Sequence, residues 1–158
     1  MSTGTGIRIA QALGIAGSTL LSAPALLTPS SFYSSTQAAI QWKDLYTRGA
    51  RTMPPLAVCA SSAYFYLAYK LHKYSRGLTQ MYATAGILTL GIVPYTLLVM
   101  VKTNDELSSK AVDAPTEKSE VAKGSEVNEL VERWSAMNLV RGLIPLTGSI
   151  VAIYATLF

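Results

Sequence analysis

Charged residues are scarce in this sequence. Only 14% of its 158 residues are Asp, Glu, Lys or Arg, whereas a soluble globular domain carries roughly 25%. The composition is 50% hydrophobic, the mean hydropathy is +0.31, and the charges are crowded into short stretches. This shortage of charge excludes an ordinary soluble domain and predicts an integral membrane protein.

Metal-binding side chains and basic patches are also nearly absent. The single cysteine, Cys59, excludes an intramolecular disulfide, and the single histidine, His72, excludes any metal site that needs two imidazoles. A helix joining these two residues would hold them about 20 Å apart, so one protomer cannot bring both to one ion. We predict no metal and no cofactor; the alternative is copper or another metal held by His72, Cys59 or methionines, with a site between subunits of a homo-oligomer if both His72 and Cys59 take part. The net charge of +4 forms no basic patch with interleaved aromatics, which argues against nucleic acid as a partner.

Long apolar runs recur along the chain. One membrane span needs about 20 residues. The runs lie at about 7–27, 54–71, 78–101 and 135–158. They predict a single all-α domain, residues 1–158, that forms a four-helix bundle in the lipid bilayer.

The connections between these runs carry most of the polar residues. Trp42 and Tyr46 share one face of a helix, which predicts a short interfacial helix between the first two spans. Pro54 and Pro55 are expected to begin the second span. We expect residues 102–134 to form a polar loop whose last part is helical and continues into the fourth span.

Small residues and proline mark the interiors of two spans. Gly14, Ser18 and Ser22 recur every four residues, a spacing that lets helices approach closely in lipid, so we interpret this stripe as a packing surface. Pro94 lies inside the third span and predicts a bend of the helix near Gly91 to Pro94.

Four spans would place the termini and connections on two faces of the membrane, which we call face A and face B. Both termini and the turn at 72–77 would lie on face A, and the connections 28–53 and 102–134 on face B. All nine acidic residues and most of the Lys and Arg lie on face B, which favours the cytosol for that face. We expect a multi-pass protein of the endoplasmic reticulum or another internal membrane.

Arg141 lies inside the predicted fourth span, where a central arginine costs about 2.5–3.5 kcal/mol. Trp134 and Asn138 share its helical face, which predicts a polar pocket on the side of face B. The other expected members of this pocket are Thr103, Asn104, Asp105, Trp42, Tyr46 and Tyr95. The alternative is that Arg141 reaches the lipid headgroups while Asn138 only joins two helices.

Short motifs follow one another in a particular order along most of the chain. They are Gly14, Gly17, Ser18, Ser22 and Pro24, then Trp42-x-x-Leu45-Tyr46-x-x-Gly49, Pro54-Pro55-Leu56-Ala57, Tyr66-Leu67-Ala68-Tyr69, Thr103-Asn104-x-x-Leu107 and Trp134-x-x-x-Asn138-x-x-Arg141. This order resembles that of the small membrane proteins of the fungal anthrone oxygenase family.

The resemblance implies a membrane-bound monooxygenase that converts an anthrone, a tricyclic aromatic polyketide, to the anthraquinone with O2. Arg141 would then stabilise the enolate oxygen, Asn138 and Asn104 would orient substrate or peroxide, and Asp105 or Tyr95 would be the base. The substrate-binding side chains would be Trp134, Trp42, Tyr46, Tyr95 and Thr103. A non-catalytic four-span scaffold or assembly protein is the alternative function, and it requires tightly interdigitated helices without a cavity.

Overall fold

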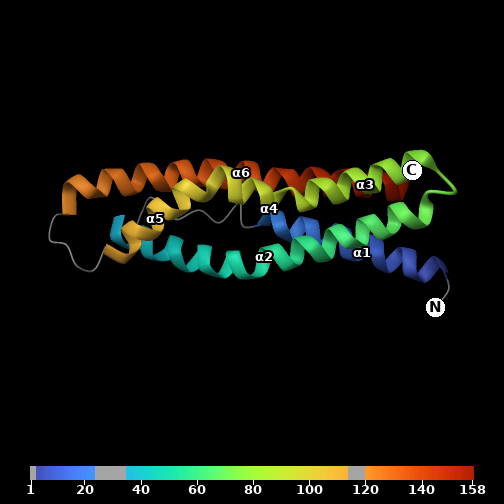
Figure 1. Cartoon of the computed structure of the whole chain (residues 1–158), viewed down its shortest axis with the longest axis horizontal. Helices are drawn as coiled ribbons and strands as arrows, with labels where there is room; N and C mark the ends of the chain where they lie inside the picture. The colour runs from blue at the N-terminus through green and yellow to red at the C-terminus, as the bar shows by residue number, and fades with distance from the viewer. Residues whose placement is uncertain (1–2, 24–34, 114–119) are drawn as a thin grey trace.

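The computed structural model describes residues 3–23, 35–113 and 120–158. These residues form long helices that run side by side (Figure 1). In chain order they are α1 Thr3–Ser22, α2 Ser35–Leu71, α3 Arg76–Leu90, α4 Ile92–Tyr95, the π-helical segment η2 Thr96–Met100, α5 Val101–Asp113 and α6 Glu120–Leu157. The predicted all-α class is confirmed for the described residues.

Two of the helices are much longer than a membrane is thick. α2 has 37 residues and α6 has 38, which at about 1.5 Å per residue gives each a length of about 55 Å. α1 lies beside only the C-terminal half of α2, and the turn at 72–75, the start of α1 and the C-terminus lie at one end of the molecule (Figure 1). The molecule therefore has four helices side by side at that end and three at the other.

The four-helix region comprises α1, residues 54–71 of α2, α3 and residues 142–157 of α6. In this region α1 and α3 each pack against both α2 and α6. Gly14 faces the ring of Tyr64 and Gly17 faces Ala60 so closely that an added Cβ would lie 2.5 Å and 2.8 Å from them. The predicted small-residue packing surface is thus confirmed at Gly14, because its missing side chain is what lets α1 approach α2.

Hydroxyl groups complete the contacts of the four-helix region. The buried Ser18 hydroxyl is hydrogen-bonded to the Tyr64 hydroxyl at 2.8 Å and to the Ser149 hydroxyl at 2.6 Å, which joins α1, α2 and α6. Gln11 donates to the Tyr82 hydroxyl at 2.9 Å and so joins α1 to α3. These bonds satisfy polar groups that would otherwise be costly to bury.

The three-helix region comprises residues 39–53 of α2, α5 and residues 126–141 of α6. Its core is built from large side chains rather than small ones. The buried members are Ala39, Trp42, Met100, Leu107, Ala111, Val127, Val131 and Trp134. Lys110 of α5 forms an ion pair with Glu126 of α6 at the surface of this region.

The expectation of a polar loop over 102–134 is wrong for most of its length. α5 continues to Asp113 and α6 already begins at Glu120, whereas residues 114–119 lie outside the described part. Leu107 and Val131 recur with helical spacing among polar neighbours, and their burial against α2 stabilises both helices. The part of the prediction that continued a helix into the fourth span is confirmed.

The short interfacial helix and the helix start at Pro54 are also corrected. Trp42 belongs to α2 and is completely buried, and α2 passes through Pro54 and Pro55 without ending. Each proline removes only the hydrogen bond to the carbonyl four residues earlier. Both prolines and Arg51 are exposed, so the freed carbonyls lie near the surface.

The bend expected near Gly91 to Pro94 stays a prediction, but the helix is irregular there. α3 ends at Leu90, α4 is a single turn, and η2 is a π-helical turn from Thr96 to Met100. Pro94 has no N–H to bond the carbonyl of Leu90, which favours a local change of helical register. This irregular segment faces α6 and α2 at the junction of the two regions.

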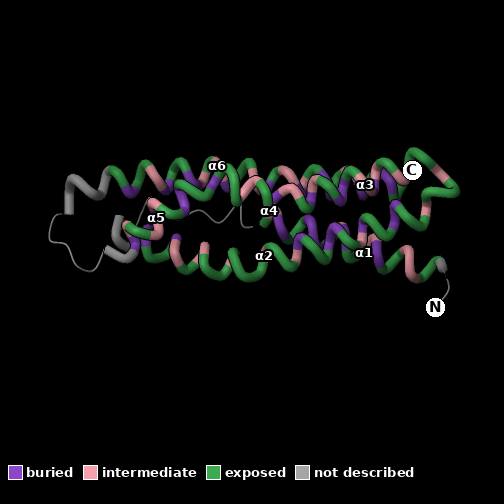
Figure 2. Tube along the Cα trace, viewed as in Figure 1, coloured by how far each residue is buried: buried purple, intermediate pink, exposed green. Residues whose placement is uncertain are grey.

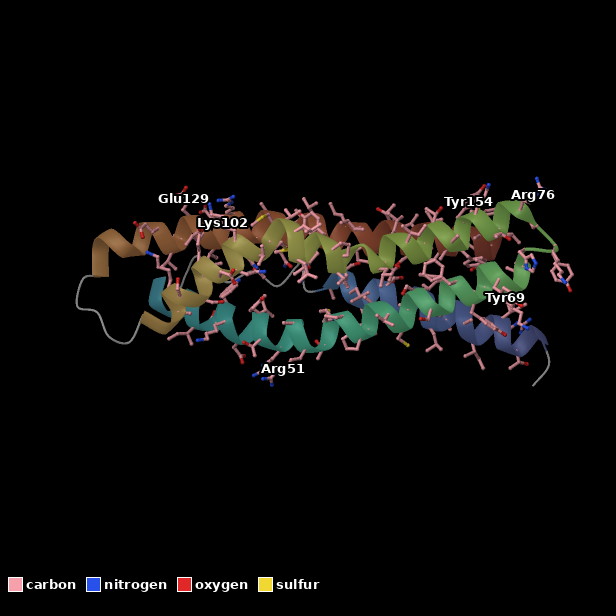
Figure 3. All side chains as sticks on the ribbon, viewed as in Figure 1. Arg51, Tyr69, Arg76, Lys102, Glu129 and Tyr154 are labelled. Atoms are coloured by element: carbon pink, nitrogen blue, oxygen red, sulfur yellow. The ribbon has the colours of Figure 1, made fainter. Side chains whose placement is uncertain are left out.

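The outer surface is apolar over a long stretch. Two helical stretches of the described chain, Arg76–Ala111 and Glu126–Leu157, are long and apolar enough to cross a membrane. Exposed residues line the outside of the bundle and buried ones face one another between helices (Figure 2). Arg76 lies near one end, whereas Lys102 and Glu129 lie in the other half (Figure 3). The expectation of four spans, rather than two, stays a prediction.

Candidate functional site

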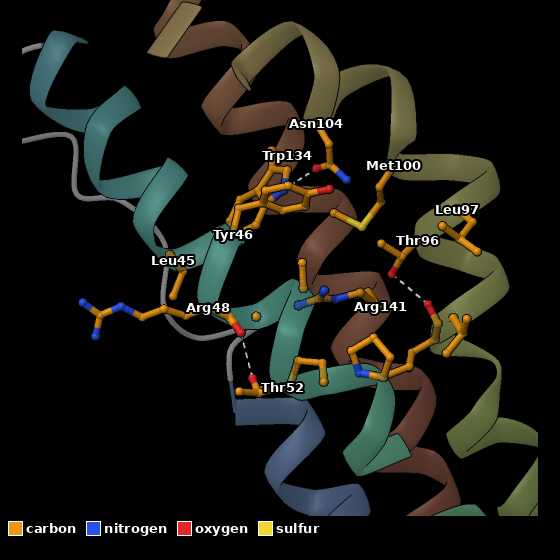
Figure 4. Close-up of a pocket in the computed structure, with 16 residues that line it drawn as sticks. Leu45, Tyr46, Arg48, Thr52, Thr96, Leu97, Met100, Asn104, Trp134 and Arg141 are labelled. Atoms are coloured by element: carbon orange, nitrogen blue, oxygen red, sulfur yellow. Dashed lines mark hydrogen bonds between the residues drawn. The ribbon is translucent and has the colours of Figure 1, made fainter. Parts of the chain in front are cut away.

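A cavity of about 310 Å³ lies at the junction of the two regions, between α2, the α4–η2 segment and α6 (Figure 4). Most of its wall is apolar. The lining residues are Leu45, Tyr46, Arg48, Gly49, Ala50, Thr52, Met53, Pro54, Ile92, Val93, Thr96, Leu97, Met100, Asn104, Trp134 and Arg141. Its volume is at the lower end of the roughly 300–1,000 Å³ typical of small-molecule sites.

Arg141 supplies positive charge to this cavity. Its side chain extends from α6 toward α2 into the space that the other residues surround (Figure 4). Arg141 is half-buried, and no described residue accepts a hydrogen bond from it or pairs with it as a carboxylate. A guanidinium in this situation is stabilised by an anionic oxygen that enters the cavity.

Arg48 is the second arginine at the cavity wall, but its charge lies elsewhere. Its guanidinium forms an ion pair with Asp44 at 3.0 Å on the exposed face of α2. In Figure 4 this group points away from the cavity, while the carbonyl of Arg48 accepts a hydrogen bond from Thr52. Of these two arginines, Arg141 is therefore the one whose charge lies in the cavity.

Aromatic rings cover one end of the cavity. Tyr46 stacks on Trp42 with ring centres 5.0 Å apart and planes 8° apart, and Trp134 meets Trp42 edge to face at 6.0 Å. The indole N–H of Trp134 donates to the amide oxygen of Asn104 at 3.0 Å, joining α6 to α5. The N–H groups of Asn104 are then the donors that this cavity-lining side chain offers to a ligand.

The structure brings together four of the residues expected in a polar pocket: Tyr46, Asn104, Trp134 and Arg141 all line the cavity. Sequence reasoning placed them at one face because Trp134 and Arg141 share a helical side.

The remaining expected residues do not line the cavity. Thr103, Asn138 and Trp42 are buried behind its wall in the helix contacts. Tyr95 is half-buried outside the lining set, although it is close enough to Arg141 for an electrostatic interaction. Asp105 is exposed on α5, on the opposite side of that helix from its buried face. The choice of Asp105 as the base therefore finds no support in its position.

Several lining residues were missed from the sequence. Gly49, Thr52 and Met53 follow Tyr46 at intervals of three, six and seven residues, so they continue its helical face. This signal was available, but Pro54 was interpreted as a helix start rather than as part of one long helix. Thr96 and Met100 were missed because the π-helical turn that places them is not visible as a sequence pattern.

Of the candidate copper ligands, His72 and Cys59 do not line this cavity, whereas the methionines Met53 and Met100 do. Cys59 is exposed on α2 rather than buried, and His72 is exposed beyond the end of that helix. Within residues 3–23, 35–113 and 120–158, no three His, Cys, Asp or Glu side chains are close enough together to hold a metal ion.

The sequence is similar to several characterised oxygenases. The anthrone oxygenase encC of Aspergillus fumigatus is 32% identical over 155 residues, covering 91% of this chain and 84% of the relative. The anthrone oxygenase ptaC of Pestalotiopsis fici is 33% identical over 139 residues, covering 87% and 96%. The noranthrone monooxygenase of Aspergillus flavus is 33% identical over 115 residues, covering 72% and 53%. No solved structure matches the chain.

These relatives, together with a helical fold that encloses an arginine-containing cavity, define an enzyme of the monooxygenase type. The sequence pattern of the family described as anthrone oxygenase matches residues 42–151. The chain belongs to the anthrone oxygenase family. The matched segment includes every described residue that lines the cavity.

Proposed function

We propose that this protein oxidises an anthrone-type aromatic polyketide to the anthraquinone with O2, in the cavity beside Arg141. The names of the relatives support the reaction, and the observation that carries its location is Arg141. This half-buried guanidinium extends into an apolar cavity and has no acceptor among the described residues. An anthrone supplies both a flat apolar body for the walls and, when ionised, an oxyanion for the arginine.

The reaction needs no redox group beyond the substrate and oxygen. A base removes a proton from the methylene carbon opposite the ketone, and the enolate oxygen binds Arg141. The carbanion transfers one electron to O2, and the resulting carbon radical and superoxide join in a C–O bond. Protonation gives a hydroperoxide, which loses its remaining C–H hydrogen and breaks the O–O bond. The products are the anthraquinone and one molecule of water.

The side chains have distinct roles in this scheme. Arg141 stabilises the enolate, and Asn104 donates to the peroxide oxygen, since preorganised donors at developing negative charge dominate such catalysis. Tyr46 is the residue that we assign to proton transfer, because it lines the cavity whereas Asp105 is exposed outside it. Trp134 contacts the aromatic rings and holds Asn104 in place.

The location that we propose is a membrane. The segment between Arg76 and Lys102 has no charged residue and as a helix extends about 37 Å, more than the roughly 30 Å of a hydrocarbon core. Large side chains such as Ile87, Leu97 and Leu98 on this segment are exposed, which suits contact with lipid. The cavity then lies near the membrane boundary, where a lipid-soluble anthrone accumulates.

The test is to follow quinone formation and O2 uptake by the purified protein in lipid vesicles with an anthrone, under air and under nitrogen, with and without chelator. We expect quinone formation above the spontaneous rate under air only, and no loss after chelation. The matched control is Arg141→Ala in the same vesicles. A rate equal to the spontaneous one would refute the reaction, and loss on chelation restored by one metal would refute its cofactor-free form.

A further inference from the structure

Gly49 occupies the centre of the α2 face that lines the cavity. Leu45 and Tyr46 lie one turn before it and Thr52 and Met53 one turn after it, and all of these residues line the cavity. Position 49 is the one place on this face where no side chain projects. The α2 backbone itself is therefore the wall of the cavity there.

Among the described residues, no contact requires glycine at this position. An added Cβ at Gly14 would lie 2.5 Å from Tyr64, and one at Gly17 would lie 2.8 Å from Ala60, whereas no described atom lies within 4 Å of an added Cβ at Gly49. The described glycines all have ordinary backbone angles without positive φ. Neither packing against the described helices nor backbone conformation explains this glycine.

Glycine inside a helix has a cost. It is less favourable than alanine in the interior of a helix such as α2. The missing side chain leaves room in the cavity, to whose wall η2 contributes Leu97 and Met100. A flat ring can lie against a backbone that carries no side chain, because nothing holds it away from the helix.

We propose that Gly49 is the specificity-determining residue of the cavity, whose bare backbone admits the substituted outer ring of a tricyclic anthrone. This assignment rests on the proposed function. It adds that the edge of the cavity at Gly49 limits the size of the substrate that can bind. A side chain at position 49 fills the space that the ring substituents occupy. Such a side chain weakens the binding of a small substrate less than that of a large one.

The test compares Gly49→Ala and Gly49→Leu with the wild type on two substrates, unsubstituted anthrone and an anthrone with hydroxyl and methyl groups on its outer rings. Gly49→Leu should raise KM for the substituted substrate by about tenfold or more and for the unsubstituted one by clearly less, with Gly49→Ala between. The matched control is Gly4→Leu, since an added Cβ at Gly4 also meets no described atom within 4 Å.

A second measurement separates binding from turnover. Quenching of tryptophan fluorescence by added anthraquinone should weaken in Gly49→Leu and remain unchanged in Gly4→Leu. Wild-type KM values for both substrates in Gly49→Leu would overturn the assignment, and so would an equal loss for both substrates in Gly49→Ala. An inactive wild type would instead refute the proposed function, whereas an active wild type with an unaffected Gly49→Leu refutes only the role of Gly49.

Discussion

The four-helix and three-helix regions of this molecule use opposite means to hold helices together. In the four-helix region Gly14 lets α1 approach α2, and Ser18 links three helices through short hydroxyl contacts. In the three-helix region the contacts include the rings of Trp42 and Trp134, the indole-to-amide bond to Asn104 and the Lys110–Glu126 ion pair. Small residues bring backbones close, whereas large rings keep them apart.

This difference explains where the cavity lies. It forms at the junction, where α1 no longer packs beside α2 and the α4–η2 segment departs from regular α-helix. A region packed by small side chains leaves little space, while a change of packing mode leaves a gap that side chains of neither region fill. We therefore expect the catalytic residues in the three-helix region and purely structural residues in the four-helix region.

The largest effect is expected for Arg141→Ala, which removes the positive charge of the cavity. We expect kcat/KM for an anthrone to fall by about 100- to 1,000-fold, the scale for loss of one donor to an oxyanion. Arg141→Lys should restore little of the lost kcat/KM, because an ammonium lacks the planar pair of donors. Initial rates per folded protein provide the measurement. Unchanged turnover in correctly inserted Arg141→Ala would exclude the arginine from the reaction.

Tyr46→Phe is expected to lower kcat by about 100-fold, since it removes the hydroxyl that takes part in proton transfer while keeping the ring that stacks on Trp42. Asp105→Asn is the matched control, and it should retain wild-type activity within about twofold because Asp105 is exposed. The same vesicle assay measures both variants. If Asp105→Asn lost activity and Tyr46→Phe retained it, the base would be Asp105 on the surface of α5 rather than a residue of the cavity.

Asn104→Ala is expected to lower kcat/KM by about tenfold, the order of one neutral hydrogen bond. It removes both the acceptor of the Trp134 indole and a donor at the cavity wall. The exposed Asn128 on α6 supplies the control, Asn128→Ala, with no expected change. An effect on thermal stability alone, with turnover preserved, would make Asn104 a residue of helix packing.

Gly14→Ala is expected to leave turnover per folded protein unchanged and to lower the free energy of unfolding by about 1–3 kcal/mol. Its Cβ would lie 2.5 Å from Cε1 of Tyr64, so α1 must shift. Thermal unfolding in detergent measures the effect, with Gly4→Ala as the unhindered control. A loss of activity without a loss of stability would show that the two regions are coupled rather than separate.

The sequence predicted the parts of the fold that depend on local pattern. Long apolar runs indicated an all-α chain, and Gly14 and Ser18 indicated close packing. Side chains that share one helical turn or face could be grouped correctly, which is how Trp134 and Arg141 were assigned to one place. These inferences need only the helical repeat and the chemistry of each residue.

Helix continuity and the membership of the cavity depended on tertiary contacts. The polar composition of 102–134 suggested a loop, but burial of Leu107 and Val131 against α2 makes helices of its two ends. Asn138 shares the turn of Arg141 and is nevertheless buried away from the cavity, because the neighbouring helices decide which part of a face meets open space. The sequence alone thus determined the all-α class and the family, whereas the packing of distant helices decided how far each helix extends, where a cavity remains and which side chains reach it.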